Sequence, residues 1–172
     1  MKNIFLTAKK QRRVLALLLM VTITLSLTPL PAWATDQVPF NASFTTEFET
    51  FLDPPFFRVN VDGEGKASHM GRTTAVTRNQ ALNLITGLAT ATYTLTAANG
   101  DTVIIDMVVP VNIQTPTGVQ FAGTYTVIGG TGRFAGATGG GAISGSATFL
   151  TAATGIGAFI LVGTISSPGS SK

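Results

Sequence analysis

The sequence has no cysteine and a single histidine, His69, and these two shortages exclude several kinds of chemistry. Without thiols the chain has no disulfide, no thiol nucleophile and no cysteine-ligated zinc or iron–sulfur cluster. One histidine cannot supply a multi-histidine metal site within one chain. We therefore expect neither a metal nor a cofactor, and a fold that is stabilised by packing and strand pairing alone.

Charge is also scarce, because charged residues make up only 11% of the 172 residues. Five of the eleven Lys and Arg residues lie among the first 13 residues, so residues 35–172 keep six of them against eight acids, a net charge of −2. The basic isoelectric point of the whole chain thus belongs to its N-terminus. Nucleic acid is not an expected partner, because binding to phosphates needs a basic surface.

The N-terminus has the pattern of a signal peptide. A basic segment is followed by the apolar run Val14 to Leu27, by two prolines, and by Ala32-Trp33-Ala34, a small-x-small cleavage pattern. The alternative is an uncleaved anchor, but the run is shorter than the roughly 20 apolar residues that span a bilayer. We expect residues 1–34 to be removed after Ala34, leaving no membrane span, and the protein to be exported to the periplasm, the cell surface or the medium.

Apolar and polar residues alternate through most of the remaining chain, which predicts strands with one buried face. Hairpin turns are expected at Asp62-Gly63-Glu64-Gly65 and at Asn99-Gly100. The segment Asn79 to Gly87 is expected to be a short helix or a long loop. The predicted strands cover about 40–49, 57–61, 66–78, 89–97, 102–109, 119–128, 142–150 and 156–166.

Short connections between sequential strands favour antiparallel neighbours. We therefore predict an all-β fold with one domain at residues 35–166, an eight-stranded antiparallel barrel, followed by a flexible tail at 167–172. Closure into a barrel removes exposed sheet edges, and glycines in the late strands allow the necessary coiling. A two-sheet sandwich is the alternative.

A glycine-rich segment, Gly129 to Thr138, contains Gly130, Gly132 and Ala135 in the spacing of a dinucleotide-binding motif. That motif needs a following helix whose N-terminus faces the pyrophosphate. The glycines that follow Ala135 cannot sustain a helix. The segment is therefore interpreted as a tight turn.

The same segment carries a family resemblance. Residues Gly123 to Gly139, with Gly129-Gly130-Thr131-Gly132-Arg133-Phe134, look like the glycine-rich turn of the dirigent and allene-oxide-cyclase-like barrels. Gly65 to Arg72 is similar to a stretch found in secreted bacterial proteins of similar layout. The resemblance implies an eight-stranded antiparallel barrel with a central cavity, often trimeric in the plant members. It carries no activity to this chain, because the pocket residues of those enzymes cannot be matched here.

Three residues are candidates for catalysis: Asp106, His69 and Tyr93. Asp106 shares a strand face with Ile104 and Val108, so an interior placement would give it a raised pKa or an ion-pair partner, whereas the opposite placement would leave it in water. His69 is expected in a strand, where it could act as an acid or base or be a structural residue.

Four further residues are weak candidates for ligand binding: Arg72, Arg78, Phe44 and Phe48. Either arginine could pair with an interior Asp106, and the phenylalanines would line a cavity. Three functions stay open: a barrel that binds a small hydrophobic ligand or partner, an isomerase- or cyclase-like enzyme acting on a hydrophobic substrate, and a structural surface or matrix protein with a filled interior.

Overall fold

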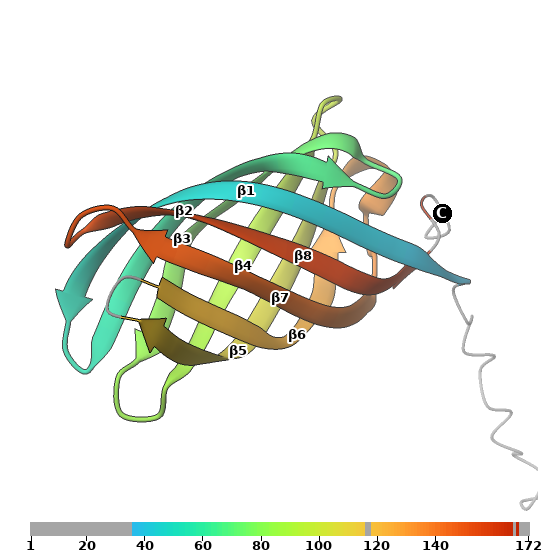
Figure 1. The fold of residues 1–172 in the computed structure, drawn as a ribbon. Coiled ribbons are helices and arrows are strands. Elements are labelled where there is room, and N and C mark those ends of the chain that lie inside the picture. The colour runs from blue at the N-terminus through green and yellow to red at the C-terminus, as the bar shows by residue number, and fades with distance from the viewer. Residues whose placement is uncertain (1–35, 116–117, 167, 169–172) are drawn as a thin grey trace, which may run out of the picture. The chain divides into compact units, whose positions relative to one another are not determined.

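A computed structural model describes residues 36–115, 118–166 and 168 as a closed barrel of eight strands (Figure 1). Every strand is antiparallel to the strands before and after it in the chain, and β8 pairs with β1 to close the wall. The predicted antiparallel barrel is confirmed, and the two-sheet sandwich is wrong. The predicted signal peptide lies outside the described residues, as does nearly all of the predicted tail. The strands are β1 (Gln37–Asp53), β2 (Phe56–Ala67), β3 (Gly71–Asn83), β4 (Leu88–Ala97), β5 (Thr102–Thr115), β6 (Gly118–Gly130), β7 (Gly139–Phe149) and β8 (Thr154–Ser166).

The predicted hairpin turn at residues 62–65 is wrong, because these residues lie within β2 and the turn comes later, at residues 68–70. Gly63 and Gly65 face the barrel interior, where a Cβ on Gly65 would overlap the backbone of β1 and the ring of Phe44. Glycine is therefore needed here for space inside the wall. The sequence pattern alone did not separate this role from that of a turn.

Two other segments extend further than predicted. β3 continues through a bulge between Val76 and Ala81, so much of the predicted helix or loop at residues 79–87 is strand. β5 passes through Pro110, where it forms no pair with β6, and the missing proline N–H breaks no hydrogen bond there. In the described part of the chain no helix has the length and apolar character of a membrane span.

The two ends of the barrel are different. At one end, to the right in Figure 1, the interior is filled by fully buried side chains, among them Phe40, Leu95, Val103 and Ile165. The 3₁₀ turn η1 (Gly132–Phe134) covers this end and buries Phe134. We call it the capped end.

Arg133 joins the turns of the capped end. Its Nε donates to Asp101 Oδ2 at 2.9 Å and its Nη2 donates to the carbonyl oxygen of His69 at 3.2 Å. Gly132 has φ of 59°, which favours glycine, and a Cβ there would overlap the Asp101 carboxylate. The glycine-rich segment is thus a turn, as predicted from its sequence, and it closes one end of the barrel.

Candidate functional site

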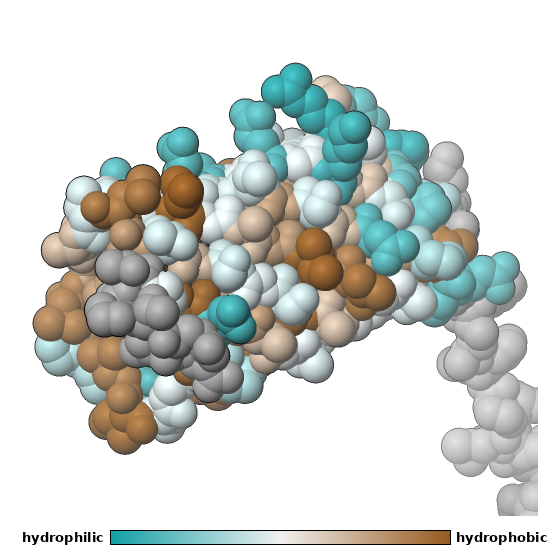
Figure 2. Space-filling view, viewed as in Figure 1, coloured by the Kyte–Doolittle hydropathy of each residue, from teal (hydrophilic) through white to brown (hydrophobic). Residues whose placement is uncertain are grey.

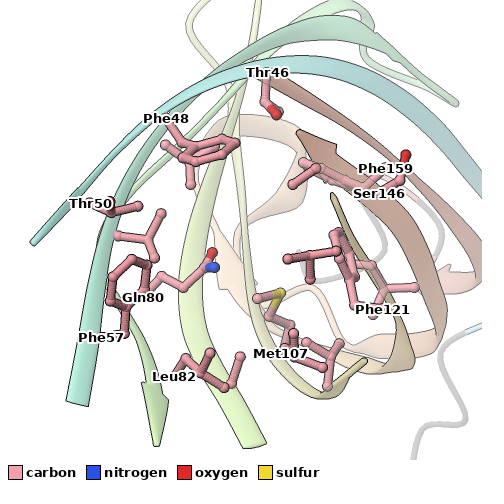
Figure 3. A pocket seen from close by; sticks show the side chains of 18 of the residues that line it. Thr46, Phe48, Thr50, Phe57, Gln80, Leu82, Met107, Phe121, Ser146 and Phe159 are labelled. Carbon is pink, nitrogen blue, oxygen red and sulfur yellow. The ribbon is translucent and has the colours of Figure 1, made fainter. Parts of the chain in front are cut away.

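The interior of the other half of the barrel is hollow (Figure 3). Some inward-facing side chains there are only half-buried, although the wall around them is continuous, because they border a cavity of about 100 Å³ that is partly open to solvent. We call this the open end. The half-buried apolar residues that line the cavity are Phe57, Leu82, Val111, Phe121, Ala147 and Phe149.

Aromatic rings form the floor and one wall of the cavity. Phe159 lies 4.9 Å from the ring of Phe44, which is buried beneath it, and 5.5 Å from the ring of Tyr93. Nearer the open end, Phe149 packs edge-on against Phe48 at 5.2 Å. Such tilted and edge-on pairs are favourable arrangements for aromatic rings. They give the cavity a fixed shape.

Glycines on the neighbouring strands make room for these rings. A Cβ on Gly155 of β8 would overlap the ring of Phe48, and a Cβ on Gly145 of β7 would overlap the ring of Phe121. The late-strand glycines therefore do more than allow the sheet to coil. Because these glycines have no Cβ, the rings of Phe48 and Phe121 can pack directly against the backbone of the wall.

A small number of polar groups face this apolar space. The Tyr93 hydroxyl donates to Gln80 Oε1 at 2.9 Å, and burial raises the pKa of the Tyr93 phenol. Thr46 and Thr50 of β1 also line the cavity, and Thr50 Oγ1 donates to the carbonyl oxygen of Ala153 at 3.2 Å. Figure 3 shows Gln80 and Thr46 on different sides of the hollow. These groups can accept or donate one or two hydrogen bonds to a ligand.

Tyr93 and Phe48 line the cavity, which is where a catalytic or binding candidate has to lie. Phe44 lies below the floor and supports Phe159. The structure thus brings together part of the aromatic set that the sequence singled out at residues 40–57.

Asp106 lies on the outer wall of β5 and is exposed, so the interior placement of this carboxylate is wrong. Its Oδ1 accepts a hydrogen bond from Thr92 Oγ1 at 2.6 Å. The apolar residues that share its face, Ile104 and Val108, also point outward. Both faces of β5 are equally apolar, so the sequence of this strand did not fix which face points into the barrel.

The two arginines also face solvent, which is a correction to the expectation that they serve the cavity. Arg72 pairs with Glu64 at 3.3 Å and Arg78 pairs with Asp62 at 2.5 Å, both on the outer wall. Exposed pairs of this kind contribute little to stability. Neither arginine can neutralise a charge in the cavity.

His69 lies in the turn between β2 and β3 at the capped end, so its predicted place in a strand is wrong. It is exposed, has φ of 63°, and its Nε2 is 3.0 Å from the carbonyl oxygen of Pro39. The full depth of the filled interior separates this turn from the open end. His69 therefore has a structural contact and no access to the cavity.

Sequence reasoning missed Gln80, Met107 and Phe121, all of which line the cavity. Gln80 lies in the segment expected to be a helix or loop, and its inward direction depends on the bulge of β3. Met107 and Phe121 belong to predicted strands, where Met107 shares its face with the buried Ile105 and Phe121 shares its face with the buried Tyr125. The alternation of β6 was the signal that could have identified Phe121, whereas the sequence of β5, apolar on both faces, did not fix the direction of Met107.

The cavity can hold an apolar molecule and make a few hydrogen bonds, and little more. Among the described residues that line it, none has a side chain that is charged at neutral pH. In the described part of the chain there is also no group of three or more acidic or histidine residues that could hold a metal ion. The cavity can therefore recognise a ligand by its shape and by apolar contacts.

No family model matches the chain, and no curated protein matches it. Among solved structures, the pterocarpan synthase dirigent protein GePTS1 is similar, with 14% sequence identity and a TM-score of 0.48 over 85% of this chain and 99% of that one. The barrel described above rests on the strand pairing of this chain itself.

Proposed function

We propose that this protein binds a small hydrophobic ligand, or the hydrophobic end of a larger one, in the open end of its barrel. The observation that supports this most strongly is the contrast between the two halves of one interior. The capped half is filled by fully buried side chains, whereas the open half leaves about 100 Å³ that is bordered by buried and half-buried apolar residues. A barrel that served only as a scaffold would gain stability by filling both halves.

The size of the cavity limits the ligand. A cavity of about 150 Å³ accommodates a molecule such as benzene, so the smaller space here fits part of a ring or a few carbons of a chain. A larger ligand would keep its remaining part outside the open end. The Tyr93–Gln80 pair would orient a hydroxyl or carbonyl group on the part that enters.

Binding is a better-supported activity than catalysis. An isomerase or cyclase acting on a hydrophobic substrate needs an acid, a base or a charge near the reacting atoms, and Asp106 and His69 both lie away from the cavity. Burial also holds Tyr93 in its protonated form, which makes it a hydrogen-bond donor and a poor base.

The test is titration with N-phenyl-1-naphthylamine, an uncharged probe that fluoresces in apolar surroundings. Ala147 lines the cavity, and Ala122 is exposed on the outer wall of the neighbouring strand β6. We expect Ala147→Leu to fill the cavity and weaken probe binding by about tenfold or more, while the matched variant Ala122→Leu binds as the wild type does. Equal binding by all three proteins would exclude the cavity as the site.

We also propose that the protein acts outside the cytoplasm after removal of residues 1–34. The basic segment, the apolar run and the cleavage pattern at Ala32-Trp33-Ala34 support this. Mass spectrometry of the protein recovered from its source cells tests it. A first residue of Thr35 is expected, and a chain that retains the basic N-terminus in the exported fraction would contradict the proposal.

A further inference from the structure

Exposed hydrophobic side chains lie along one side of the open end of the barrel. They lie on or beside three turns, which connect β1 to β2, β3 to β4 and β7 to β8. Figure 2 shows hydrophobic residues gathered at this end, on the left of the view. The residues, which we call the apolar rim, are Phe51 (52% exposed), Leu52 (64%), Leu84 (53%), Ile85 (82%), Leu88 (38%) and Leu150 (64%).

Backbone hydrogen bonds hold the turns of the rim beside one another. The N–H of Leu84 donates to the carbonyl oxygen of Pro55 at 3.0 Å, which joins the β3–β4 turn to the β1–β2 turn. The N–H of Thr50 donates to the carbonyl oxygen of Ala153 at 2.7 Å, which joins the β7–β8 turn to β1. The hydrophobic tips are therefore held at neighbouring positions around one side of the cavity mouth.

The three turns that carry the rim are also electrically neutral, and the exposed Glu49 of β1 lies beside them, opposite Thr154. Residues 50–58, 83–88 and 149–154 contain two charged residues, Asp53 and Arg58. These two pair with each other at 3.1 Å, and the Arg58 guanidinium lies over the Phe56 ring at 4.9 Å. The turns of the capped end, by contrast, present Asn99, Asp101 and Arg133.

The shape of the rim distinguishes between two kinds of partner. A second copy of the chain would need a flat, complementary surface, and the outer wall of β8 offers one in the exposed residues Ile156, Ile160 and Val162. The rim consists of separate turn tips around an open cavity, and a protein seated on it would block the mouth. A bilayer interface accepts protruding hydrophobic side chains without needing a complementary shape.

We propose that the apolar rim docks the protein, open end down, on the surface of a lipid bilayer, so that a hydrophobic ligand passes between the membrane and the cavity without crossing water. Docking depends on the rim alone. The transfer of a ligand rests on the proposed function. Because the rim carries no net charge, docking is expected on uncharged lipid and is expected to be insensitive to salt.

The experiment measures sedimentation with phosphatidylcholine vesicles for three proteins that carry the same N-terminus. The first is the wild type, and the second is the rim variant Leu84→Ser, Ile85→Ser, Leu150→Ser. The third is a matched wall variant, Ile128→Ser, Ile160→Ser, Val162→Ser, which removes three exposed aliphatic residues away from the rim. Circular dichroism checks folding and gel filtration checks oligomeric state, and each protein is also titrated with the naphthylamine probe in the absence of vesicles.

We expect the wild type and the wall variant to partition onto vesicles alike, at low and high salt, and the rim variant to partition at least about tenfold less. The rim variant should still bind the probe in solution. Equal losses in both variants, no binding by the wild type, or a rim-dependent dimer in gel filtration would each overturn membrane docking. Vesicle binding that persists while the wild type fails to bind the probe would instead contradict the proposed function and leave docking supported.

Discussion

Tyr93 and Tyr125, the two tyrosines of the chain, both point into the barrel, but only one of them has a hydrogen-bond partner for its hydroxyl. Tyr93 donates to Gln80 at the cavity, whereas the Tyr125 hydroxyl is buried with no partner among the described residues. The same chemical change, from tyrosine to phenylalanine, should therefore have opposite effects at the two positions.

We expect Tyr93→Phe to lower the free energy of unfolding by about 1 kcal/mol, because Gln80 loses its partner in an apolar wall. The double variant Tyr93→Phe, Gln80→Leu removes both polar groups and should recover most of that loss. Urea unfolding of the single and double variants gives the coupling free energy. Additive losses would show that the pair is not coupled.

We expect Tyr125→Phe to raise the free energy of unfolding by about 1 kcal/mol, since it removes a buried hydroxyl that has no partner. The ring contact with Phe40, 6.5 Å between centroids, remains in the variant. The measurement is again urea unfolding. A loss of stability would mean that a bridging water satisfies the hydroxyl in the folded protein.

Burial of both tyrosines predicts a loss of stability at alkaline pH. Burial raises the pKa of Tyr125 to about 12 and raises the pKa of Tyr93 as well, against an ordinary value of 10.0. Above pH 10 the unfolded chain ionises its tyrosines and the folded chain does not, so the free energy of unfolding falls as pH rises from about 10 to 12. Tyrosinate absorbance should appear only with unfolding. Its appearance near pH 10 in the folded barrel would contradict the buried placement.

The capped end predicts an acid dependence of the opposite sign. Hydrogen bonds from Arg133 and then from Asn99 lower the pKa of Asp101 below its ordinary value of 3.8. Their contribution to stability is present above that pH and is lost as pH falls through the lowered pKa. We expect Arg133→Gln to melt at a lower temperature than the wild type at neutral pH, with the difference shrinking below about pH 4. A difference that stays constant with pH would show that Asp101 does not carry the effect.

The alternation of the sequence was sufficient to predict the strands, because in most of them only one face is apolar, and the short connections then favoured a barrel over the alternative sandwich. Phe40, Phe44 and Phe48 could face only one way. In β5 both faces are apolar, so the direction of Asp106 depended on the register with β4 and β6, which local sequence does not encode.

The candidate site was less predictable for a related reason. Gln80 reaches the cavity through a bulge, and bulges arise from the pairing of two strands. Gly63 and Gly65 were interpreted as a turn, because the sequence does not distinguish a glycine that leaves room for an aromatic ring from a glycine that bends the chain. The hollow depends on how side chains from facing strands fill the interior together, and the sequence of one strand alone does not show this.

The proposed binding function depends most on the hollow at the open end. A crystal structure of the protein under xenon pressure tests most directly whether this hollow exists. Xenon binds in dry apolar cavities. We predict a xenon site between Met107, Phe121 and Phe159, present in the wild type and lost in Ala147→Leu. An interior at that end filled by side chains, with no xenon bound, would contradict the account.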